Sequence, residues 1–429
     1  MTGPEVPAAP PERASRAAIV AIGSELLSPL RQDTNSLWLT ARLEEVGIVV
    51  ARKAIVSDEI ADIVGELETA SRSAALIVTT GGLGPTADDR TVEALARWLG
   101  VSLERNAEFL AKIRARFERR GIRMPEVNAK QADFPPGARV LENPRGTAPG
   151  FWGRRGDTEV VVLPGVPSEM REIMEATVLP ELARRSGGAV ARRRILRIAG
   201  MGESAVEELV APVYARWPEN PVTILASPGE VELHLVTRGD PAAADRRLRA
   251  MEADFRAALG TRVYGEDSAA LSQAVGELLR RRTLRLALAE SCTGGMVAAL
   301  VTDVAGSSDY FLGGAVTYAD SAKQALLDVS PETLARHGAV SGESAREMAR
   351  GALARFGADV ALSLTGIAGP GGGSEAKPVG TVHIAIAGPE GKELLKKRLF
   401  VGDRDLIRRT ASRHALELLR RHLLAAEPA

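Results

Sequence analysis

Cysteine is nearly absent from this sequence, and neither sign of charge is in excess. Cys292 is the single cysteine among 429 residues, which excludes an intramolecular disulfide and a zinc site made of several thiolates. Such a composition fits a reducing compartment, so we expect a cytoplasmic protein. Lysine and arginine together number 55, as do aspartate and glutamate, and this balance provides no general attraction to nucleic acid or to an anionic membrane. We therefore expect neither of these partners.

Aromatic residues and long apolar segments are also scarce. Aromatics make up 4% of the chain, so its cores must be built mainly from Ala, Val, Leu and Ile. No uncharged apolar run reaches the roughly 18 residues that a membrane-spanning helix needs. Residues 1–16 are rich in Pro and Ala and lack a basic segment followed by an apolar one, so we expect a flexible tail and no signal peptide.

The first region, 17–190, alternates between buried strands and amphipathic helices. Apolar runs at 18–22, 48–56 and 74–79 predict strands, and each is followed by apolar residues at helical spacing. This alternation predicts a parallel sheet covered by helices on both faces, with ligands at the carboxyl ends of the strands. A further strand at 159–163 precedes a helix start and closes the domain.

Two more regions follow. Residues 191–265 carry a shorter mixture of strands and helices, which predicts a small α+β connector. Residues 266–429 return to apolar strands, at 284–289 and 359–365, each neighboured by an amphipathic helix. The chain is therefore expected to hold two α/β domains joined by the connector.

A glycine-rich turn follows the third predicted strand. Gly82 and Gly84 lie in 82–87 (GLGPTA), which formally fits the G-x-G-x-x-A pattern of dinucleotide-binding proteins. That pattern belongs after the first strand, however, and Pro85 removes a backbone donor. We therefore interpret the turn as a phosphate site, formed by Gly82, Gly84 and Thr86 at the start of a helix.

Acidic residues accompany this turn. Asp88 and Asp89 could hold a metal ion on the phosphate, and Asp33, after the first strand, could face the same crevice. In the alternative interpretation the glycines only make a tight turn and Asp88 caps the helix. The sequence leaves both interpretations open.

In the third region Ser291 stands at a strand-to-helix turn. The amides of Thr293, Gly294 and Gly295 should point outward there without partners inside the helix, which makes them candidate oxyanion donors. Alternatively, Ser291 only caps the helix. Cys292 could be a nucleophile, but a cysteine at this place is more often a packing residue.

Tyr318 and Lys323 follow a later apolar strand and favour a chemical role for the serine. A desolvated lysine near a serine can act as its base. Four residues lie between Tyr318 and Lys323, whereas the Tyr/Lys pair of short-chain dehydrogenases has three residues between its members. A histidine triad is not indicated, because the histidines are scattered without a catalytic signature: His234, His337, His383, His414 and His422.

Several motifs together resemble the CinA family, the competence/damage-inducible proteins, across nearly the whole chain after residue 16. They are 79–86 (TTGGLGPT) with Asp88 and Asp89, 143–150 (NPRGTAPG), 163–170 (LPGVPSEM), 290–295 (ESCTGG) and 365–370 (TGIAGP). The resemblance implies a MoaB/MogA-like three-layer α/β domain at 17–190, a KH-like α+β connector at 191–265 and a CinA amidase α/β domain at 266–429. We also expect a homodimer.

The resemblance further implies two activities in pyridine-nucleotide salvage. The first domain would cleave ADP-ribose to AMP and ribose 5-phosphate with a divalent metal, Mg, Mn or Co. The third would deamidate nicotinamide mononucleotide without a cofactor. The first loop departs from the family pattern at Ser24 and at 28–30, so the first domain could instead be only a nucleotide- or pterin-binding module.

Residue roles for the third domain also come from the resemblance. Ser291 would be the nucleophile, Lys323 its base and Tyr318 a hydrogen-bonding partner. The other positions, at which the substrate would be held, are Thr293, Gly294, Gly295, Thr365, Gly366, Gly369 and, for its phosphate, Arg404 in 402–404 (GDR), with Arg408 as second choice.

Overall fold

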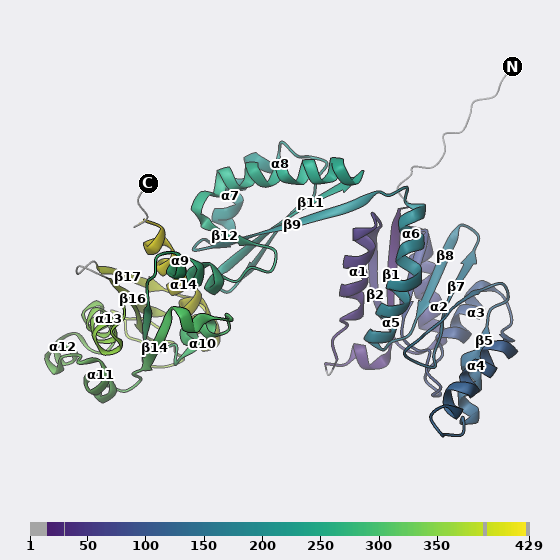
Figure 1. Ribbon diagram of the computed structural model, residues 1–429, viewed down its shortest axis with the longest axis horizontal. Helices are drawn as coiled ribbons and strands as arrows, with labels where there is room; N and C mark the ends of the chain where they lie inside the picture. The colour runs from purple at the N-terminus through teal and green to yellow at the C-terminus, as the bar shows by residue number, and fades with distance from the viewer. Residues whose placement is uncertain (1–14, 30, 389–392, 426–429) are drawn as a thin grey trace, which may run out of the picture. The chain divides into compact units, whose positions relative to one another are not determined.

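A computed structural model describes residues 15–29, 31–388 and 393–425 (Figure 1). The predicted tail at 1–16 therefore lies almost wholly outside the described residues. The chain divides into two compact units, one of Met1–Arg192 with Thr237–Arg247 and one of Arg193–Val236 with Leu248–Ala429.

A six-stranded sheet forms the centre of the first unit. Its order is β2-β1-β3-β8-β7-β6, in which the first four strands run parallel and the last two antiparallel. The strands are β1 (Arg16–Ile22), β2 (Val49–Val56), β3 (Leu76–Thr80), β6 (Arg139–Leu141), β7 (Gly150–Arg155) and β8 (Thr158–Leu163).

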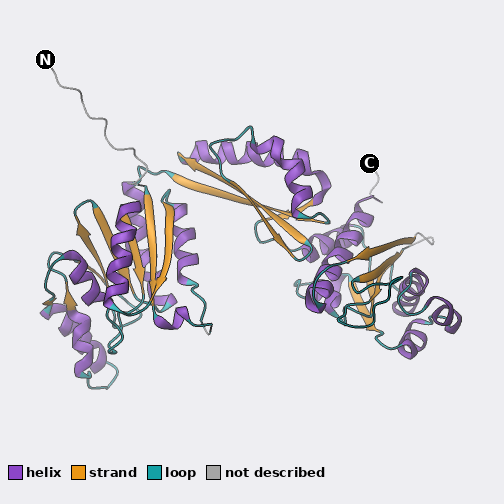
Figure 2. Cartoon of the chain, turned by 180° about the vertical axis from the view of Figure 1, so that it is seen from behind, coloured by secondary structure: helices purple, strands orange, loops and turns teal. Residues whose placement is uncertain are grey.

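Helices cover both faces of this sheet (Figure 2). Alternate residues of β1 point to opposite faces, as the two-residue period of a strand requires. Ala18 and Val20 pack with α2 (Ile60–Ser73) and α3 (Thr91–Leu99), whereas Ile19 packs with α1 (Asn35–Glu45), α5 (Pro167–Ile173) and α6 (Leu179–Arg185). The predicted three-layer α/β domain is thereby confirmed. The remaining elements of this unit are η1 (Ser24–Leu27), β4 (Glu104–Arg105), α4 (Ala107–Glu118), η2 (Glu126–Ala132), β5 (Asp133–Phe134) and the π-helical turn η3 (Met174–Val178).

The connector is a four-stranded sheet with two helices, and this confirms the α+β prediction. The strand order is β10-β11-β9-β12. The elements are β9 (Val190–Ala199), α7 (Glu203–Tyr214), β10 (Val222–Ser227), β11 (Glu230–Gly239), α8 (Pro241–Leu259), η4 (Gly260–Arg262) and β12 (Val263–Glu266).

The C-terminal domain is built on a five-stranded sheet of order β14-β13-β15-β16-β17. β13 pairs in parallel with β14 and β15, while β16 and β17 extend the sheet antiparallel. The strands are β13 (Leu286–Glu290), β14 (Phe311–Val316), β15 (Val360–Gly366), β16 (Thr381–Ala387) and β17 (Glu393–Leu399).

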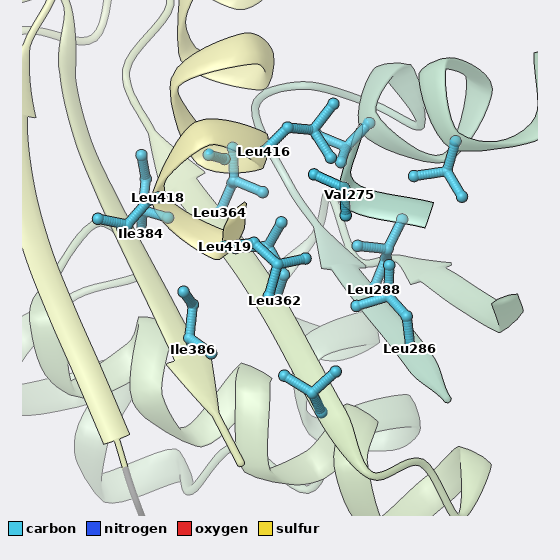
Figure 3. Packing of buried hydrophobic residues seen from close by; sticks show 14 of the residues in the cluster. Val275, Leu286, Leu288, Leu362, Leu364, Ile384, Ile386, Leu416, Leu418 and Leu419 are labelled. Atoms are coloured by element: carbon cyan, nitrogen blue, oxygen red, sulfur yellow. The ribbon is translucent and has the colours of Figure 1, made fainter. Parts of the chain in front are cut away.

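Two helical layers enclose this sheet as well. Leu286 and Leu288 of β13 face α9 (Leu271–Arg281), α10 (Met296–Thr302) and α14 (Arg404–Ala425). Ala287 and Ala289 face the other layer, formed by α11 (Asp320–Leu327), α12 (Pro331–His337) and α13 (Gly342–Phe356). Figure 3 shows the first core, where the β-strand side chains meet those of α9 and α14: Val275, Leu286, Leu288, Leu362, Leu364, Ile384, Ile386, Leu416, Leu418 and Leu419.

Within the described part of the chain, no helix combines the length and the apolar character needed to cross a bilayer.

Candidate active site

Ser291 lies where β13 ends and the turn into α10 begins. Its amide donates to the Leu364 carbonyl of β15 at 3.0 Å, and the carbonyl of Glu290 accepts from the Thr317 amide, just past β14, at 2.7 Å. The serine is thus fixed at the carboxyl ends of three parallel strands, the edge at which α/β sheets bind ligands. Only 7% of its surface is exposed.

Lys323 reaches Ser291 from α11. Its Nζ lies 3.3 Å from the Ser291 Oγ and donates to the Thr317 carbonyl at 2.9 Å. The lysine is 1% exposed, and this burial lowers its pKa, although Asp320 at 3.7 Å opposes the shift. A lowered pKa increases the fraction of Lys323 that is neutral near pH 7, and a neutral amine can accept the proton of the serine hydroxyl.

The amides after Ser291 are not arranged as the sequence indicated. The Gly294 amide donates to the Ser291 carbonyl at 3.1 Å, and the Gly295 amide donates to the Glu290 carboxylate at 3.0 Å. The prediction of free amides at Gly294 and Gly295 is therefore wrong, because a nearby carboxylate and a backbone carbonyl occupy them. Of the predicted set, the Thr293 amide keeps the role of candidate oxyanion donor.

Cys292 belongs to the hydrophobic core beside the serine. Burial is the main cause that raises the pKa of its thiol to about 11, and the Glu290 carboxylate adds to the shift. A thiol with that pKa stays protonated near neutral pH, where the thiolate is the reactive form. The geometry therefore supports packing as the role of Cys292.

Tyr318, Gly369 and Arg404 meet beside this site, although they come from three separate segments. Arg404, the first residue of α14, donates to the Gly369 carbonyl at 2.7 Å and to the Tyr318 hydroxyl at 2.9 Å. Tyr318 is 61% exposed, so a ligand has access to its ring. Two residues that the sequence singled out, the cation Arg404 and the hydroxyl-bearing Tyr318, are thus in direct contact.

Arg408 follows one turn later on α14 and contacts the serine turn. It donates through Nη2 to the Thr293 carbonyl at 2.8 Å. Its Nε and the Thr293 hydroxyl are both buried without a hydrogen-bond partner among the described residues. Arg408 therefore supports the turn, and Arg404 is the arginine with the better access to a phosphate.

Thr365 and Gly366 shape the loop next to the serine. The fully buried Thr365 hydroxyl donates to the Ala339 carbonyl at 2.8 Å. A Cβ at Gly366 would lie 2.7 Å from the Thr381 carbonyl oxygen, so only glycine fits there. Their contact with a substrate stays a prediction.

A second candidate site lies at the carboxyl ends of the strands in the first domain. A cavity of about 690 Å³ opens there, and its lining includes five residues that the sequence singled out. These are Asp33, Gly82, Gly84, Asp88 and Asp89.

Close contacts surround both glycines of this turn, and Gly82 also has a backbone conformation that favours glycine. Gly82 has a φ of +65°, and a Cβ on it would lie 2.2 Å from the Thr91 Oγ1. A Cβ on Gly84 would lie 2.4 Å from the Asp89 carboxylate. α3 begins after Arg90 without a side-chain cap, so the alternative that Asp88 caps this helix does not hold.

Thr86 faces Asp89 rather than the cavity. The Thr86 amide donates to Asp89 Oδ2 at 2.9 Å, and its hydroxyl donates to the same oxygen. Lys130, which the sequence did not single out, donates to the carbonyls of Thr86 and Asp89 and so closes the turn from behind. The prediction that Thr86 holds phosphate directly is not supported, because both donors already have a partner.

Asn35 is a second residue that sequence analysis missed. Its amide nitrogen donates to the Thr80 hydroxyl at 3.0 Å and to the Gly165 carbonyl at 2.8 Å, which joins α1 to the ends of β3 and β8. Its Oδ1 is buried without a partner among the described residues, and Asn35 lines the cavity. A local sequence motif could not reveal the role of Asn35, because its hydrogen-bond partners are distant in sequence.

The described carboxylates of the cavity do not form a ready-made metal site. No three His, Cys, Asp or Glu side chains within the described residues are grouped to hold an ion, and Asp33 already accepts from the Ser36 amide at 2.9 Å. Mg²⁺, however, is often held by only one or two carboxylates together with substrate phosphates. Asp88, which lines the cavity, fits that mode of binding.

The cavity is strongly acidic. Its lining contains one arginine, Arg31, against six carboxylates: Glu25, Asp33, Asp58, Asp88, Asp89 and Glu169. Such a surface repels a free phosphate and attracts cations. An anionic ligand would therefore bind best together with a cation.

Known families match the chain in three consecutive segments. Residues 18–184 match a probable molybdopterin binding domain, 193–265 the damage-inducible protein CinA KH domain, and 268–423 the CinA C-terminal domain. Fold and sites thus define a mixed α/β protein in which a MoaB/MogA-like domain, a KH-like connector and a CinA C-terminal domain follow one another.

Individual relatives agree over nearly the whole length. A CinA-like protein of Solibacter usitatus is 43% identical over 408 residues, 95% of this chain and 98% of its own. A putative competence-damage inducible protein of Symbiobacterium thermophilum is 45% identical over 420 residues, 95% of this chain and 99% of its own. The chain belongs to the CinA family. A solved structure, competence/damage inducible protein CihA from Agrobacterium tumefaciens, is 44% identical, covers 36% of this chain and 93% of its own, and gives a TM-score of 0.35.

Proposed function

We propose that the C-terminal domain hydrolyses the carboxamide of nicotinamide mononucleotide to nicotinate mononucleotide and ammonia. The observation that carries the proposal is the buried Lys323 amine 3.3 Å from the Ser291 hydroxyl. A serine next to a lysine of lowered pKa is an activated nucleophile. Hydrolysis of an amide requires such a nucleophile, because a neutral hydroxyl attacks an amide carbon too slowly.

The reaction begins when neutral Lys323 takes the proton of the Ser291 hydroxyl. The Oγ then forms a bond to the carboxamide carbon, and the oxyanion that results is stabilised by nearby amides such as that of Thr293. Lys323 returns the proton to the amide nitrogen, the C–N bond breaks, and ammonia leaves. A water molecule then hydrolyses the ester, which yields the acid and restores Ser291.

Arg404 and Tyr318 are suited to bind the phosphate of the mononucleotide. The Arg404 guanidinium is an always-charged donor with fixed geometry, and Tyr318 places a hydroxyl 2.9 Å from it. No metal takes part in this proposal.

For the first domain we propose a metal-dependent cleavage of ADP-ribose to AMP and ribose 5-phosphate. The acidic cavity of about 690 Å³ beside the Gly82–Gly84 turn supports it. A divalent ion, carried by the phosphates and held by Asp88 or Asp89, would neutralise phosphate charge and supply an activated water. The alternative is a domain that binds a nucleotide or pterin without turnover, which the fold would equally allow.

The test offers both substrates to the purified full chain and follows the products by chromatography. We expect deamidation to continue with EDTA present, and ADP-ribose cleavage to require Mg, Mn or Co. Ser291→Ala and Asp88→Asn serve as reciprocal controls, since each should remove one activity and spare the other. Wild-type deamidation by Ser291→Ala would exclude the serine mechanism. Binding of ADP-ribose without cleavage under every metal would favour the binding module.

A further inference from the structure

Glu290, the last residue of β13 and the first of the 290–295 motif, has a buried carboxylate to which the sequence alone assigns no role. The residue is 1% exposed. Its Oε2 accepts from the amides of Gly295 at 3.0 Å and Val297 at 3.1 Å, and its Oε1 accepts from the Ala298 amide at 2.8 Å. One side chain therefore satisfies three backbone donors around the start of α10.

Such donors usually attract an external anion. The first amides of a helix lack partners within it and carry a partial positive charge, which favours phosphate or an oxyanion. Here a carboxylate of the chain itself fills that position. The start of α10 is consequently closed to a ligand, although only the turn at 292–295 separates it from the candidate nucleophile.

The same residue is also connected to the candidate base. The Glu290 carbonyl accepts from the Thr317 amide at 2.7 Å, and the Thr317 carbonyl accepts from Lys323 at 2.9 Å. Lys323 in turn lies 3.3 Å from the Ser291 hydroxyl. A continuous set of hydrogen bonds thus links Glu290 to both members of the pair.

We propose that Glu290 is a positioning residue for Ser291 and Lys323. Its carboxylate takes the place of an anion at the start of α10, fixes the turn that carries Ser291 and holds the hydroxyl at hydrogen-bond distance from the lysine. The inference deepens the proposed deamidase and rests on it. Glu290 itself is not expected to touch substrate.

The position of Glu290 has a second consequence that does not depend on catalysis. Cys292 is influenced by the charged groups around it, namely Glu290, Arg408 and Lys323. The Glu290 carboxylate raises the pKa of the thiol beyond what burial alone does. Because Cys292 is the single cysteine of 429 residues, no other thiol contributes to the alkylation signal.

The experiment compares Glu290→Gln with the wild-type full chain and with Glu332→Gln, a control in the exposed first turn of α12. Glutamine has a similar shape, but it replaces one acceptor oxygen by an NH₂ group and removes the charge. With nicotinamide mononucleotide we expect kcat to fall by about 10–100-fold and KM to change less than about threefold, as for a residue that acts through its neighbours. With iodoacetamide we expect the pH midpoint of Cys292 alkylation to shift downward. The control should change neither value.

Glu290→Asp separates charge from geometry. It keeps the carboxylate but shortens the side chain, so we expect a lowered kcat with a Cys292 midpoint close to that of the wild type. If circular dichroism shows that Glu290→Gln does not fold, Glu290→Asp alone decides: a lowered kcat supports positioning, and a wild-type kcat overturns it.

The two readouts keep the inference distinct from the proposed function. A wild-type protein that does not deamidate would refute the function, whereas the alkylation profiles would still show whether Glu290 controls the turn. A Glu290→Gln protein with wild-type kcat, or with an unchanged Cys292 midpoint, would overturn the inference.

Discussion

The Arg404 guanidinium donates a hydrogen bond to the Tyr318 hydroxyl at 2.9 Å, although 86 residues separate the two in sequence. The contact joins the start of α14 to the segment between β14 and α11. Because the same arginine donates to the Gly369 carbonyl at 2.7 Å, three chain segments meet at one guanidinium. This places a fixed positive charge on the hydroxyl of Tyr318, whose backbone carbonyl accepts from Lys323 at 3.4 Å.

A double-mutant cycle tests this contact. We expect Arg404→Met to raise the KM for nicotinamide mononucleotide by about 10–100-fold, since it removes a charged donor. Tyr318→Phe should have a milder effect. If the two act together, the double variant should lose less than the sum, by an interaction energy of about 0.5–1.5 kcal/mol. Strict additivity of the two losses would show that the hydrogen bond does not contribute to binding.

The pH dependence of the deamidase tests Lys323. The lysine must be neutral to accept a proton, and burial lowers its pKa, so kcat/KM should rise with pH and reach its plateau below pH 10.5. Lys323→Arg should reduce kcat by about 10²–10⁴-fold, because a guanidinium cannot release its proton. Lys397→Arg on the exposed strand β17 is the matched control. A pH-independent rate would contradict the assignment.

The same shift of Lys323 affects stability. Between its lowered pKa and the ordinary value of 10.5, the unfolded chain binds more protons than the folded one. The contribution of this residue to the free energy of unfolding therefore rises with pH across that window. Differential scanning calorimetry of Lys323→Met beside the wild type should show a weaker pH dependence of the melting temperature in the variant.

Replacing Cys292 should leave the deamidase active. The thiol has a pKa of about 11, so it is protonated at pH 7, and it packs in the core. We expect Cys292→Ala to keep kcat within about threefold of the wild type while losing about 1 kcal/mol of stability from the removed apolar contact. Steady-state assays and thermal melts measure the two effects. A large loss of kcat in a folded variant would transfer the nucleophile's role to the thiol.

Two glycine substitutions in the first domain should have opposite effects. Gly82→Ala places a Cβ 2.2 Å from the Thr91 Oγ1 at a positive φ, so we expect a loss of about 1–3 kcal/mol and of ADP-ribose cleavage. Gly65→Ala lies within α2, where nothing comes within 4 Å of the new atom, and should gain up to about 1 kcal/mol. Thermal melts of both variants decide. Equal melting temperatures would show that the turn can relax around Gly82.

Much of the architecture could be predicted because buried strands and helices place apolar residues at regular intervals along the sequence. In β1 every second residue faces one helical layer, and that period is visible in sequence. β10 and β17 carry no clear apolar period, because most of their residues are exposed, so the sequence does not indicate them. Ser291 could be placed at a strand-to-helix turn for the same local reason.

The sequence by itself determined the succession of the three regions, the glycine turns and the residue types of both sites, since all of these depend on neighbours along the chain. Only the tertiary structure brings Lys323 to Ser291, which lies 32 positions earlier in the sequence. It alone also brings the Arg404 guanidinium to the Tyr318 hydroxyl. It also decided that the Glu290 carboxylate takes the Gly295 amide, one of the three amides expected to hold an oxyanion. Local pattern cannot settle such competition, because a backbone donor bonds to the acceptor that packing brings nearest.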